Sequence, residues 1–206
     1  MSARRLWGLV PVKRLGESKT RLQSALSAQG RRELAWRLYR HTLQALVQAR
    51  DQLSGILVVS ADDEALSEAR GRGLETLRES GAHGLNAALR QGSQRIADRG
   101  GDGVFVLPID LPSLGGARLR EALAELPPGR VVAIAPDRKR EGTNALVVAP
   151  LGLIDFQFGL GSFDAHLSAA RETGCEVVVW EDPEFTYDID VAEDLSPLSR
   201  APLDGP

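Results

Sequence analysis

The chain of 206 residues contains a single cysteine, Cys175, and three histidines. One cysteine excludes a disulfide within the chain and is typical of a protein in a reducing compartment. The histidines, His41, His83 and His166, lack the spacing of a zinc motif such as H-E-x-x-H. No apolar stretch approaches the roughly 18 residues of a membrane span, and no signal peptide is recognisable. We therefore expect a soluble, cytoplasmic protein with no membrane partner.

An excess of positive charge is also lacking. The 25 Lys and Arg residues stand against 28 Asp and Glu residues, which gives a formal net charge of -3. A slightly acidic chain is poorly suited to the nucleic-acid backbone, so we expect no nucleic-acid partner. Two glycine-rich nucleotide motifs, G-x-x-x-x-G-K-[ST] and G-x-G-x-x-G, are absent from the sequence. Any nucleotide must therefore be bound in another way.

The chain does contain short apolar runs that alternate with helical patterns. We expect strands at 6–12, 56–60, 75–78, 103–107, 131–135, 145–149 and 176–180, and helices at 29–49, 62–70, 86–97, 118–126 and 163–172. Strands separated by helices predict a single α/β domain over 1–206, with a mostly parallel (mixed) sheet and helices on both faces. Residues 196–206 are expected to form a flexible tail. In open sheets of this kind, ligands bind at the carboxyl ends of the strands.

The loop after the first strand, PVKRLGESKTRL, is basic. It holds Lys13, Arg14, Lys19 and Arg21 around Gly16. Lysine and arginine supply positive charge for phosphates, and glycine lets the backbone come close to a ligand. The alternative is a solvated basic loop without a ligand.

Two further stretches place polar side chains at helix starts. In GAHGLNAALRQG, Gly84 precedes a helix and Asn86 lies in its first turn, where the amide could pair with a base or ribose edge. In FQFGLGSFDAH, Ser162 opens a helix after Gly159, an arrangement suited to an anion. His166 follows one turn later and could touch that anion. The alternative in each case is a helix cap, formed by Asn86 or by Ser162.

Carboxylates at a strand end and in a later acidic segment suggest a metal. Asp110 lies between two prolines in LPIDLP, directly after an apolar run. Asp188 and Asp190 flank one residue in YDIDVAEDL, so in an extended segment they point the same way. Mg²⁺ prefers hard oxygen ligands and needs only one or two carboxylates beside substrate phosphates. The alternative is a capped helix, with Asp190 as cap and Glu193 completing a capping box; it is compatible with metal binding by Asp188.

Taken in order, the motifs PVKRLGESKTRL, GLNAAL, LPIDLP, DRKREGTNAL, FGLGSFDAH and DIDVAEDL resemble the family of 2-phospho-L-lactate and phosphoenolpyruvate guanylyltransferases. The resemblance runs from about Leu9 to Leu195. It implies a GT-A-like, Rossmann-related nucleotidyltransferase fold. It also implies that GTP is condensed with a three-carbon phospho-acid, with release of pyrophosphate, in the biosynthesis of the deazaflavin coenzyme F(420).

The resemblance also implies roles for individual residues. The catalytic residues are Asp110 and Lys19. The contacts to the phospho-acid are Thr143, Gly159 and Ser162. The nucleotide-binding residues are Lys13, Gly16, Lys19, Arg21, Gly84 and Asn86. The ligands of Mg²⁺ are Asp110, Asp188 and Asp190.

Two alternative functions remain at this point. The first is another nucleotidyltransferase, of cytidylyl or sugar-phosphate type, against which the GTN and FGLGSF motifs argue. The second is a non-catalytic nucleotide-binding regulator, against which the retained carboxylates argue. The acceptor could be phosphoenolpyruvate, 2-phospho-L-lactate or 3-phosphoglycerate. We expect its product to pass to a downstream deazaflavin transferase.

Overall fold

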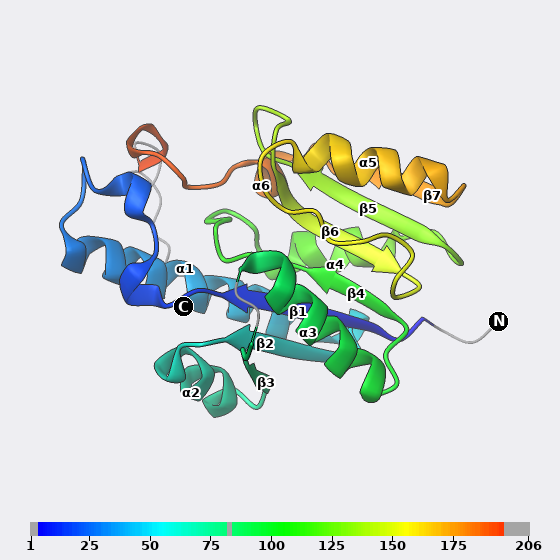
Figure 1. The fold of residues 1–206 in the computed structure, drawn as a ribbon, viewed down its shortest axis with the longest axis horizontal. Coiled ribbons are helices and arrows are strands. Elements are labelled where there is room, and N and C mark those ends of the chain that lie inside the picture. The colour runs from blue at the N-terminus through cyan, green and yellow to red at the C-terminus, as the bar shows by residue number, and fades with distance from the viewer. Residues whose placement is uncertain (1–3, 82–83, 196–206) are drawn as a thin grey trace.

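The computed structural model describes residues 4–81 and 84–195 and is built around one seven-stranded sheet (Figure 1). The strands lie in the order β3-β2-β1-β4-β6-β5-β7. Their bounds are β1 Leu6–Val12, β2 Gly55–Ser60, β3 Glu75–Arg78, β4 Gly103–Val106, β5 Val131–Pro136, β6 Thr143–Ala149 and β7 Glu176–Val179. β6 runs antiparallel to both of its neighbours, and the other neighbouring pairs are parallel. The predicted mostly parallel, mixed sheet is confirmed. The predicted tail at 196–206 lies outside the described residues.

Helices cover both faces of this sheet. They are α1 Ala28–Gln48, α2 Asp63–Gly71, α3 Leu85–Asp98, α4 Gly116–Ala124, α5 Ser162–Glu172 and α6 Pro183–Thr186, with short 3₁₀ turns η1 Leu15–Glu17, η2 Thr20–Leu22, η3 Arg50–Gln52 and η4 Ala192–Leu195. One buried cluster joins the sheet to α1, α2, α4 and α6, and a second joins it to α3 and α5. Within 4–81 and 84–195, no helix has the length and apolarity needed to cross a membrane.

The central strand β1 shows why the apolar runs are continuous. Successive side chains of a strand point to opposite faces, so Leu9 packs in the cluster of α3 and α5 and Val10 in the cluster of α1, α2 and α4. Both faces are covered, so every residue of β1 is buried. Gly92 lets α3 lie close to the sheet, because a Cβ at this position would stand 2.5 Å from Leu9 Cδ1.

Some bounds differ from those that the sequence predicted. The strand predicted at 145–149 begins two residues earlier, because Thr143 and Asn144 are buried and Thr143 pairs with Pro136 of β5. The helix predicted at 118–126 begins at Gly116, also two residues earlier. The sequence pattern missed these starts because it was traced from apolar residues, whereas the strand begins with buried polar residues and the helix begins with a glycine.

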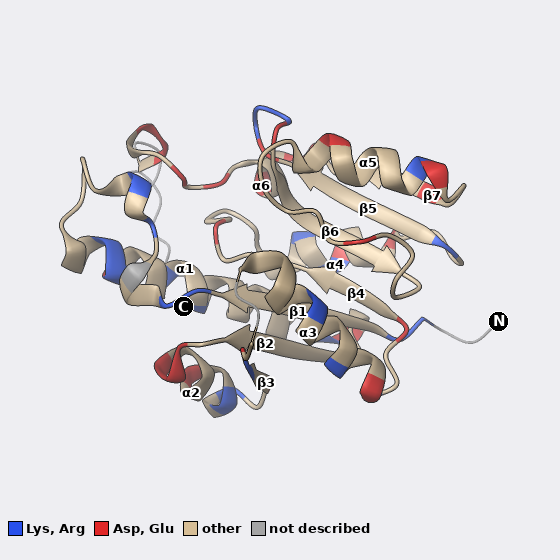
Figure 2. Cartoon of the chain, in the orientation of Figure 1, with Lys and Arg blue, Asp and Glu red and all other residues tan. Residues whose placement is uncertain are grey.

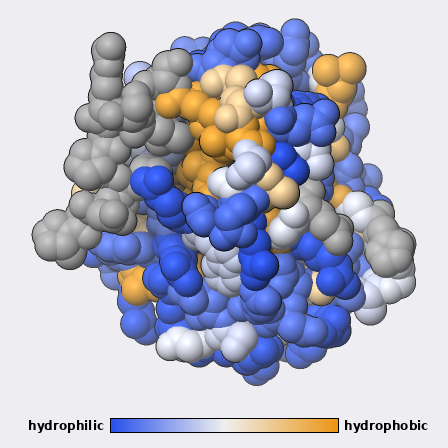
Figure 3. Space-filling view, turned by 90° about the vertical axis from the view of Figure 1, so that its left-hand side faces the viewer, coloured by the Kyte–Doolittle hydropathy of each residue, from blue (hydrophilic) through white to orange (hydrophobic). Residues whose placement is uncertain are grey.

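The carboxyl ends of β1, β2, β4 and β5 share one edge of the sheet, toward the left of Figure 1. Figure 2 shows basic segments of the loop after β1 and acidic segments of the later chain on this side. Figure 3 looks onto the same side and shows an apolar area next to hydrophilic surface. The fold therefore brings the predicted site segments to one edge, where the surface is partly apolar and partly charged.

Candidate active site

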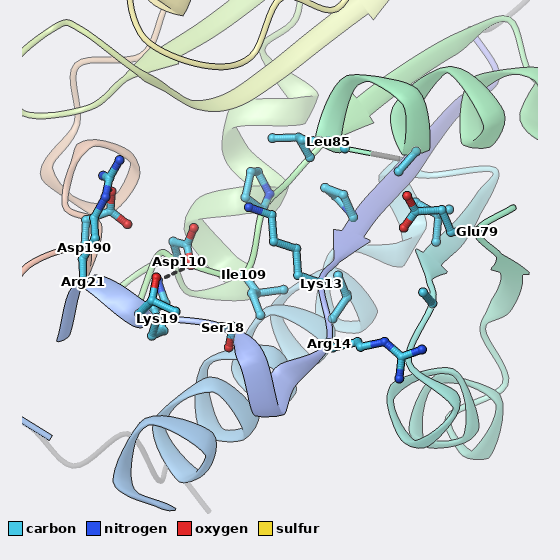
Figure 4. A pocket seen from close by; sticks show the side chains of 18 residues that line it. Lys13, Arg14, Ser18, Lys19, Arg21, Glu79, Leu85, Ile109, Asp110 and Asp190 are labelled. Atoms are coloured by element: carbon cyan, nitrogen blue, oxygen red, sulfur yellow. Dashed lines mark hydrogen bonds and ion pairs between the residues drawn. The ribbon is translucent and has the colours of Figure 1, made fainter. Parts of the chain in front are cut away.

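A cavity of about 710 Å³ lies at this edge of the sheet, within the size range of small-molecule sites (Figure 4). It is bounded by the loop after β1, the end of β2, the start of α3 and the segment after β4. The predicted site residues that line it are Lys13, Lys19, Arg21, Gly84, Asp110 and Asp190. The structure thus brings together most of the residues predicted to bind nucleotide and metal.

Apolar residues fix the basic loop after β1. The side chains of Leu15 and Leu22 are buried, and the Leu15 N–H donates to Asp62 Oδ2 at 2.9 Å. The neighbouring Lys13 is exposed and lines the cavity. Gly16 lies outside the lining, and a Cβ there would meet nothing within 4 Å. Its role toward nucleotide therefore stays a prediction.

Lys19 connects three segments of the site. Its side chain is 6% exposed, and its ammonium pairs with Asp110 (Figure 4). The same Nζ donates to the backbone oxygen of Ile189 at 2.6 Å. The Lys19 backbone is left-handed, with φ 57°, a conformation that costs about 1–2 kcal/mol for a residue with a Cβ. These contacts hold the residue in that conformation and place its charge beside Asp110.

The two acidic segments meet through Ile189. The Ile189 N–H donates to the backbone oxygen of Asp110 at 3.1 Å, and its buried side chain packs against α1 through Leu34 and Leu38. Asp190, on one side of Ile189, pairs with Arg21 at 2.9 Å. This anchor explains how two segments far apart in the sequence present their carboxylates to one place.

The Asp188 carboxyl has an unusual environment. Burial raises its pKa to about 6, and the charges of Asp190, Asp110 and Asp137 also raise it. The Asp188 carboxyl is therefore poorly solvated and has other carboxylates nearby. In the described part of the chain, no three His, Cys, Asp or Glu side chains are grouped closely enough to hold a metal by themselves. Mg²⁺ needs only one or two carboxylates when substrate phosphates supply the rest, so the donor set fits this ion.

Asp194 shapes the acidic segment, and the sequence did not predict this role. Its Oδ2 accepts the N–H groups of Asp190 and Val191, both at 2.8 Å, and its other oxygen pairs with Arg138. Burial acts to raise the pKa of Asp194, but the two N–H groups and Arg138 outweigh it and hold the pKa below its usual value. The predicted capping box with Glu193 is wrong, because Asp194 takes the Asp190 N–H instead.

The residues predicted to contact the phospho-acid form a second group, which is not part of the lining of the cavity. Thr143 starts β6 and Ser162 starts α5, and the Phe163 N–H donates to the Glu141 oxygen at 3.5 Å, which joins the two segments. The Ser162 N–H donates to the Gly159 oxygen at 3.1 Å, so it is already used within the turn. The Ser162 hydroxyl is buried and has no partner in the described residues.

Glycine conformations determine the shape of the loop before α5. Gly159 has φ 140° and Gly161 has φ 72°, both in the region that disfavours a side chain. Gly161 is the N-cap of α5, so the alternative in which Ser162 caps the helix is wrong. Leu160, between the two glycines, is 97% exposed. The loop therefore presents backbone on a tight turn, and the buried Ser162 hydroxyl has no hydrogen-bond partner within the described residues.

Asn86 forms hydrogen bonds with the loop before α5. Its Nδ2 donates to the Phe158 oxygen and its Oδ1 accepts the Phe158 N–H, both at 2.9 Å. The N-cap of α3 is Gly84, with φ 107°, so the alternative in which Asn86 caps the helix is also wrong. The structure thus places Asn86 against the loop before α5, and its predicted contact to the nucleoside stays a prediction.

Comparison with known proteins agrees with the motifs. The model of the family described as "Guanylyl transferase CofC like" matches residues 7–199. A phosphoenolpyruvate guanylyltransferase of Rubrobacter xylanophilus is 41% identical over 196 residues, which covers 95% of this chain and 94% of that protein. A 2-phospho-L-lactate guanylyltransferase of Methanothermobacter thermautotrophicus is 35% identical over 190 residues, which covers 92% of this chain and 82% of that protein.

Solved structures extend the similarity to the fold. A nucleotidyl transferase from Methanothermobacter thermautotrophicus has a TM-score of 0.66 at 19% identity, covering 95% of this chain and 96% of that one. The 4-diphosphocytidyl-2C-methyl-D-erythritol synthase of Anaerococcus prevotii has a TM-score of 0.61 at 12% identity, covering 96% of this chain and 99% of that one. These similarities confirm the predicted nucleotidyltransferase fold. Together with the family match, they show that the chain belongs to the CofC-like guanylyl transferase family.

Proposed function

We propose that this guanylyltransferase condenses GTP with phosphoenolpyruvate and releases pyrophosphate. Three relatives named phosphoenolpyruvate guanylyltransferase are 41%, 38% and 33% identical to this chain, and support that acceptor. A 2-phospho-L-lactate guanylyltransferase is 35% identical, so the closely similar phospho-lactate is the acceptor to compare. In the proposal the product serves the biosynthesis of coenzyme F(420) and passes to a downstream deazaflavin transferase.

The observation that carries this proposal is the meeting of Lys19 with Asp110 in a cavity lined by basic residues. An oxygen of the acceptor phosphate attacks the α-phosphorus of GTP, a P–O bond forms, and the bond to the pyrophosphate group breaks. The acceptor phosphate is ionised at neutral pH, so no general base is needed. The main barrier is the crowding of negative charge, which Lys13, Lys19 and Arg21 reduce by placing cations along the triphosphate.

Mg²⁺ is the cofactor that the carboxylates fit. Asp110, with Asp188 or Asp190, would hold it, and the bound ion would neutralise charge on phosphate oxygens. The raised pKa of Asp188 supports this assignment, because a cation would offset the cost of burying its charge and the repulsion from the neighbouring carboxylates.

Pyrophosphate release tests the proposal directly. The protein is incubated with Mg²⁺ and GTP, and separately with phosphoenolpyruvate, 2-phospho-L-lactate or 3-phosphoglycerate, while ATP, CTP and UTP replace GTP in parallel reactions. We expect pyrophosphate only with GTP, and fastest with phosphoenolpyruvate. Turnover of CTP in place of GTP would identify another type of nucleotidyltransferase. Binding of GTP without pyrophosphate from any acceptor would indicate a non-catalytic regulator.

A further inference from the structure

His166 lies on α5 and is fully buried, and both of its ring nitrogens take part in hydrogen bonds. Nε2 accepts the backbone N–H of Gln157 at 2.9 Å. Nδ1 lies 3.0 Å from the hydroxyl oxygen of Thr143. The ring also makes an edge-to-face contact with Phe158, with 5.0 Å between the centroids. His166 thus contacts the two segments that carry the residues predicted to bind the phospho-acid.

The partners of the ring fix its protonation state. A backbone N–H can only donate, so Nε2 must carry a lone pair and no hydrogen. Burial lowers the pKa of His166 to about 4, so the ring is neutral at pH 7 and carries one proton. That proton therefore resides on Nδ1, and Nδ1 donates to the Thr143 hydroxyl oxygen.

This arrangement determines what Thr143 can offer to a ligand. Its oxygen accepts from His166, so its own hydrogen points elsewhere, and no second partner of this hydroxyl occurs among residues 4–81 and 84–195. Ser162 lies one helical turn before His166, and its buried hydroxyl also has no partner in the described chain. Buried polar groups are normally paired, and acceptor oxygens of a bound phospho-acid would supply partners for these two hydroxyl groups.

His166 also helps to place the loop before α5. It holds the backbone of Gln157, and Asn86 holds the backbone of the next residue, Phe158, through two hydrogen bonds. Two side chains from different helices thus fix consecutive residues, and Gly159 follows directly. His166 is the side chain that contacts both this loop, through Gln157, and Thr143.

We propose that His166 is a positioning residue for the phospho-acid: it fixes the Thr143 hydroxyl as a hydrogen-bond donor and holds the Gly159 turn beside it. The proposal rests on the proposed function, because it takes Thr143, Gly159 and Ser162 as the acceptor site. His166 itself has no free nitrogen for the substrate. It acts through Thr143, and its neutral ring brings no positive charge to the site.

Two matched substitutions separate the two hydrogen bonds of the ring. In His166→Asn, the side-chain Nδ2 takes the place of Nδ1 and can still donate to Thr143. In His166→Gln, the side-chain Oε1 takes the place of Nε2 and can still accept from Gln157, but the donor to Thr143 is lost. We expect His166→Gln to raise the KM for the phospho-acid about tenfold, the usual effect of one lost hydrogen bond, with the KM for GTP within about twofold. His166→Asn loses the bond to Gln157, but Asn86 still holds the adjacent Phe158 through two hydrogen bonds, so both KM values should stay within about threefold of the wild type.

A double-mutant cycle tests whether His166 acts through Thr143. In a Thr143→Val background, which lacks the hydroxyl, His166→Gln should change the KM for the phospho-acid by less than about twofold. Equal KM values for the Asn and Gln variants, or an equal rise in the KM for GTP, would overturn the proposal. A wild-type protein that releases no pyrophosphate with any phospho-acid would instead overturn the proposed function.

A measurement on the wild type covers the case in which the variants do not fold. ¹⁵N NMR of the His166 ring reports which nitrogen carries the proton. We expect protonated Nδ1 and unprotonated Nε2 at pH 7, in the free protein and with phosphoenolpyruvate bound. A proton on Nε2 would overturn the proposal, because Nδ1 could then no longer donate to Thr143.

Discussion

Replacing Asp110 with asparagine removes one negative charge and keeps the size of the side chain. The side chain of Lys19 is 6% exposed, and its ammonium pairs with Asp110, whose side chain is 35% exposed. Asparagine still offers an oxygen to that ammonium, and Nζ keeps its 2.6 Å hydrogen bond to the Ile189 oxygen. The fold therefore loses only the ionic part of one hydrogen bond, about 1–2 kcal/mol. For a chain of this length, that lowers the melting temperature by about 2–8 °C.

The effect on the reaction should be much larger than the effect on the fold. The Asp110 carboxylate is assigned to Mg²⁺ and lies beside the lysine that meets the triphosphate, and asparagine is a weaker ligand without charge. We expect turnover to fall at least about a hundredfold, equivalent to about 2.7 kcal/mol of transition-state stabilisation. Pyrophosphate release at saturating GTP and phosphoenolpyruvate measures this loss, and thermal unfolding measures stability on the same sample.

A matched control is Asp98→Asn, which removes the same charge from an exposed residue at the end of α3. It should leave turnover unchanged. If Asp110→Asn retained turnover within about threefold of the wild type, the carboxylate would have no part in the reaction. If its melting temperature fell by more than about 8 °C, Asp110 would be chiefly a structural residue.

Three other substitutions test separate parts of the site. Lys19→Met keeps much of the side-chain length but removes the charge, so steady-state kinetics should show a rise of at least about tenfold in the KM for GTP. A rise confined to the phospho-acid would contradict the assignment of this loop to the triphosphate. Ser162→Ala removes a hydroxyl without a partner in the described chain, so the melting temperature should change by less than about 2 °C while the KM for the phospho-acid rises; unchanged kinetics would exclude the contact. The pKa of His166 is lowered to about 4 from its ordinary 6.5, so the unfolded chain binds a proton that the folded chain refuses between these values. The neutral ring of His166 therefore contributes to the free energy of unfolding. This contribution is fully present above pH 6.5 and is lost as the pH falls to 4, and it amounts to about 3 kcal/mol in all. Urea unfolding should show a smaller loss between pH 7 and pH 4.5 for His166→Asn than for the wild type, and equal losses would mean that the histidine is not buried neutral.

The strands were predictable because both faces of the sheet are covered. Continuous apolar runs such as that of β1 mark buried strands wherever helices pack on both sides. The start of β6 was missed, since Thr143 and Asn144 are buried but polar, and their burial depends on partners far along the chain. A pattern of apolar residues does not reveal a strand whose first residues are polar and hydrogen-bonded.

The cavity residues were predictable because topology fixes where strands end. Lys13 follows β1 and Asp110 follows β4, and these neighbouring parallel strands end at the same edge. The roles of Asp194 and Asn86 could not be predicted in this way. Each forms its hydrogen bonds with backbone groups whose positions depend on the complete fold. The capping alternatives for Asn86 and Ser162 failed for a local reason, because glycines take the N-cap positions of both helices.

The antiparallel direction of β6 explains how its first two residues, Thr143 and Asn144, contact two different parts of the predicted site. β6 is antiparallel to β4, with Val106 opposite Leu146, so Thr143 lies beyond the carboxyl end of β4, on the side from which Asp110 follows. Adjacent residues of a strand point to opposite faces, and the two polar residues that open β6 do so. Thr143 contacts His166 on the α5 face, whereas Asn144 donates to the backbone oxygens at 185 and 186, at 3.1 and 3.2 Å. Those oxygens lie just before the acidic segment at 188–190. The start of one strand therefore holds the Thr143 hydroxyl against α5 on one face and, on the other face, holds the backbone that leads into the acidic segment.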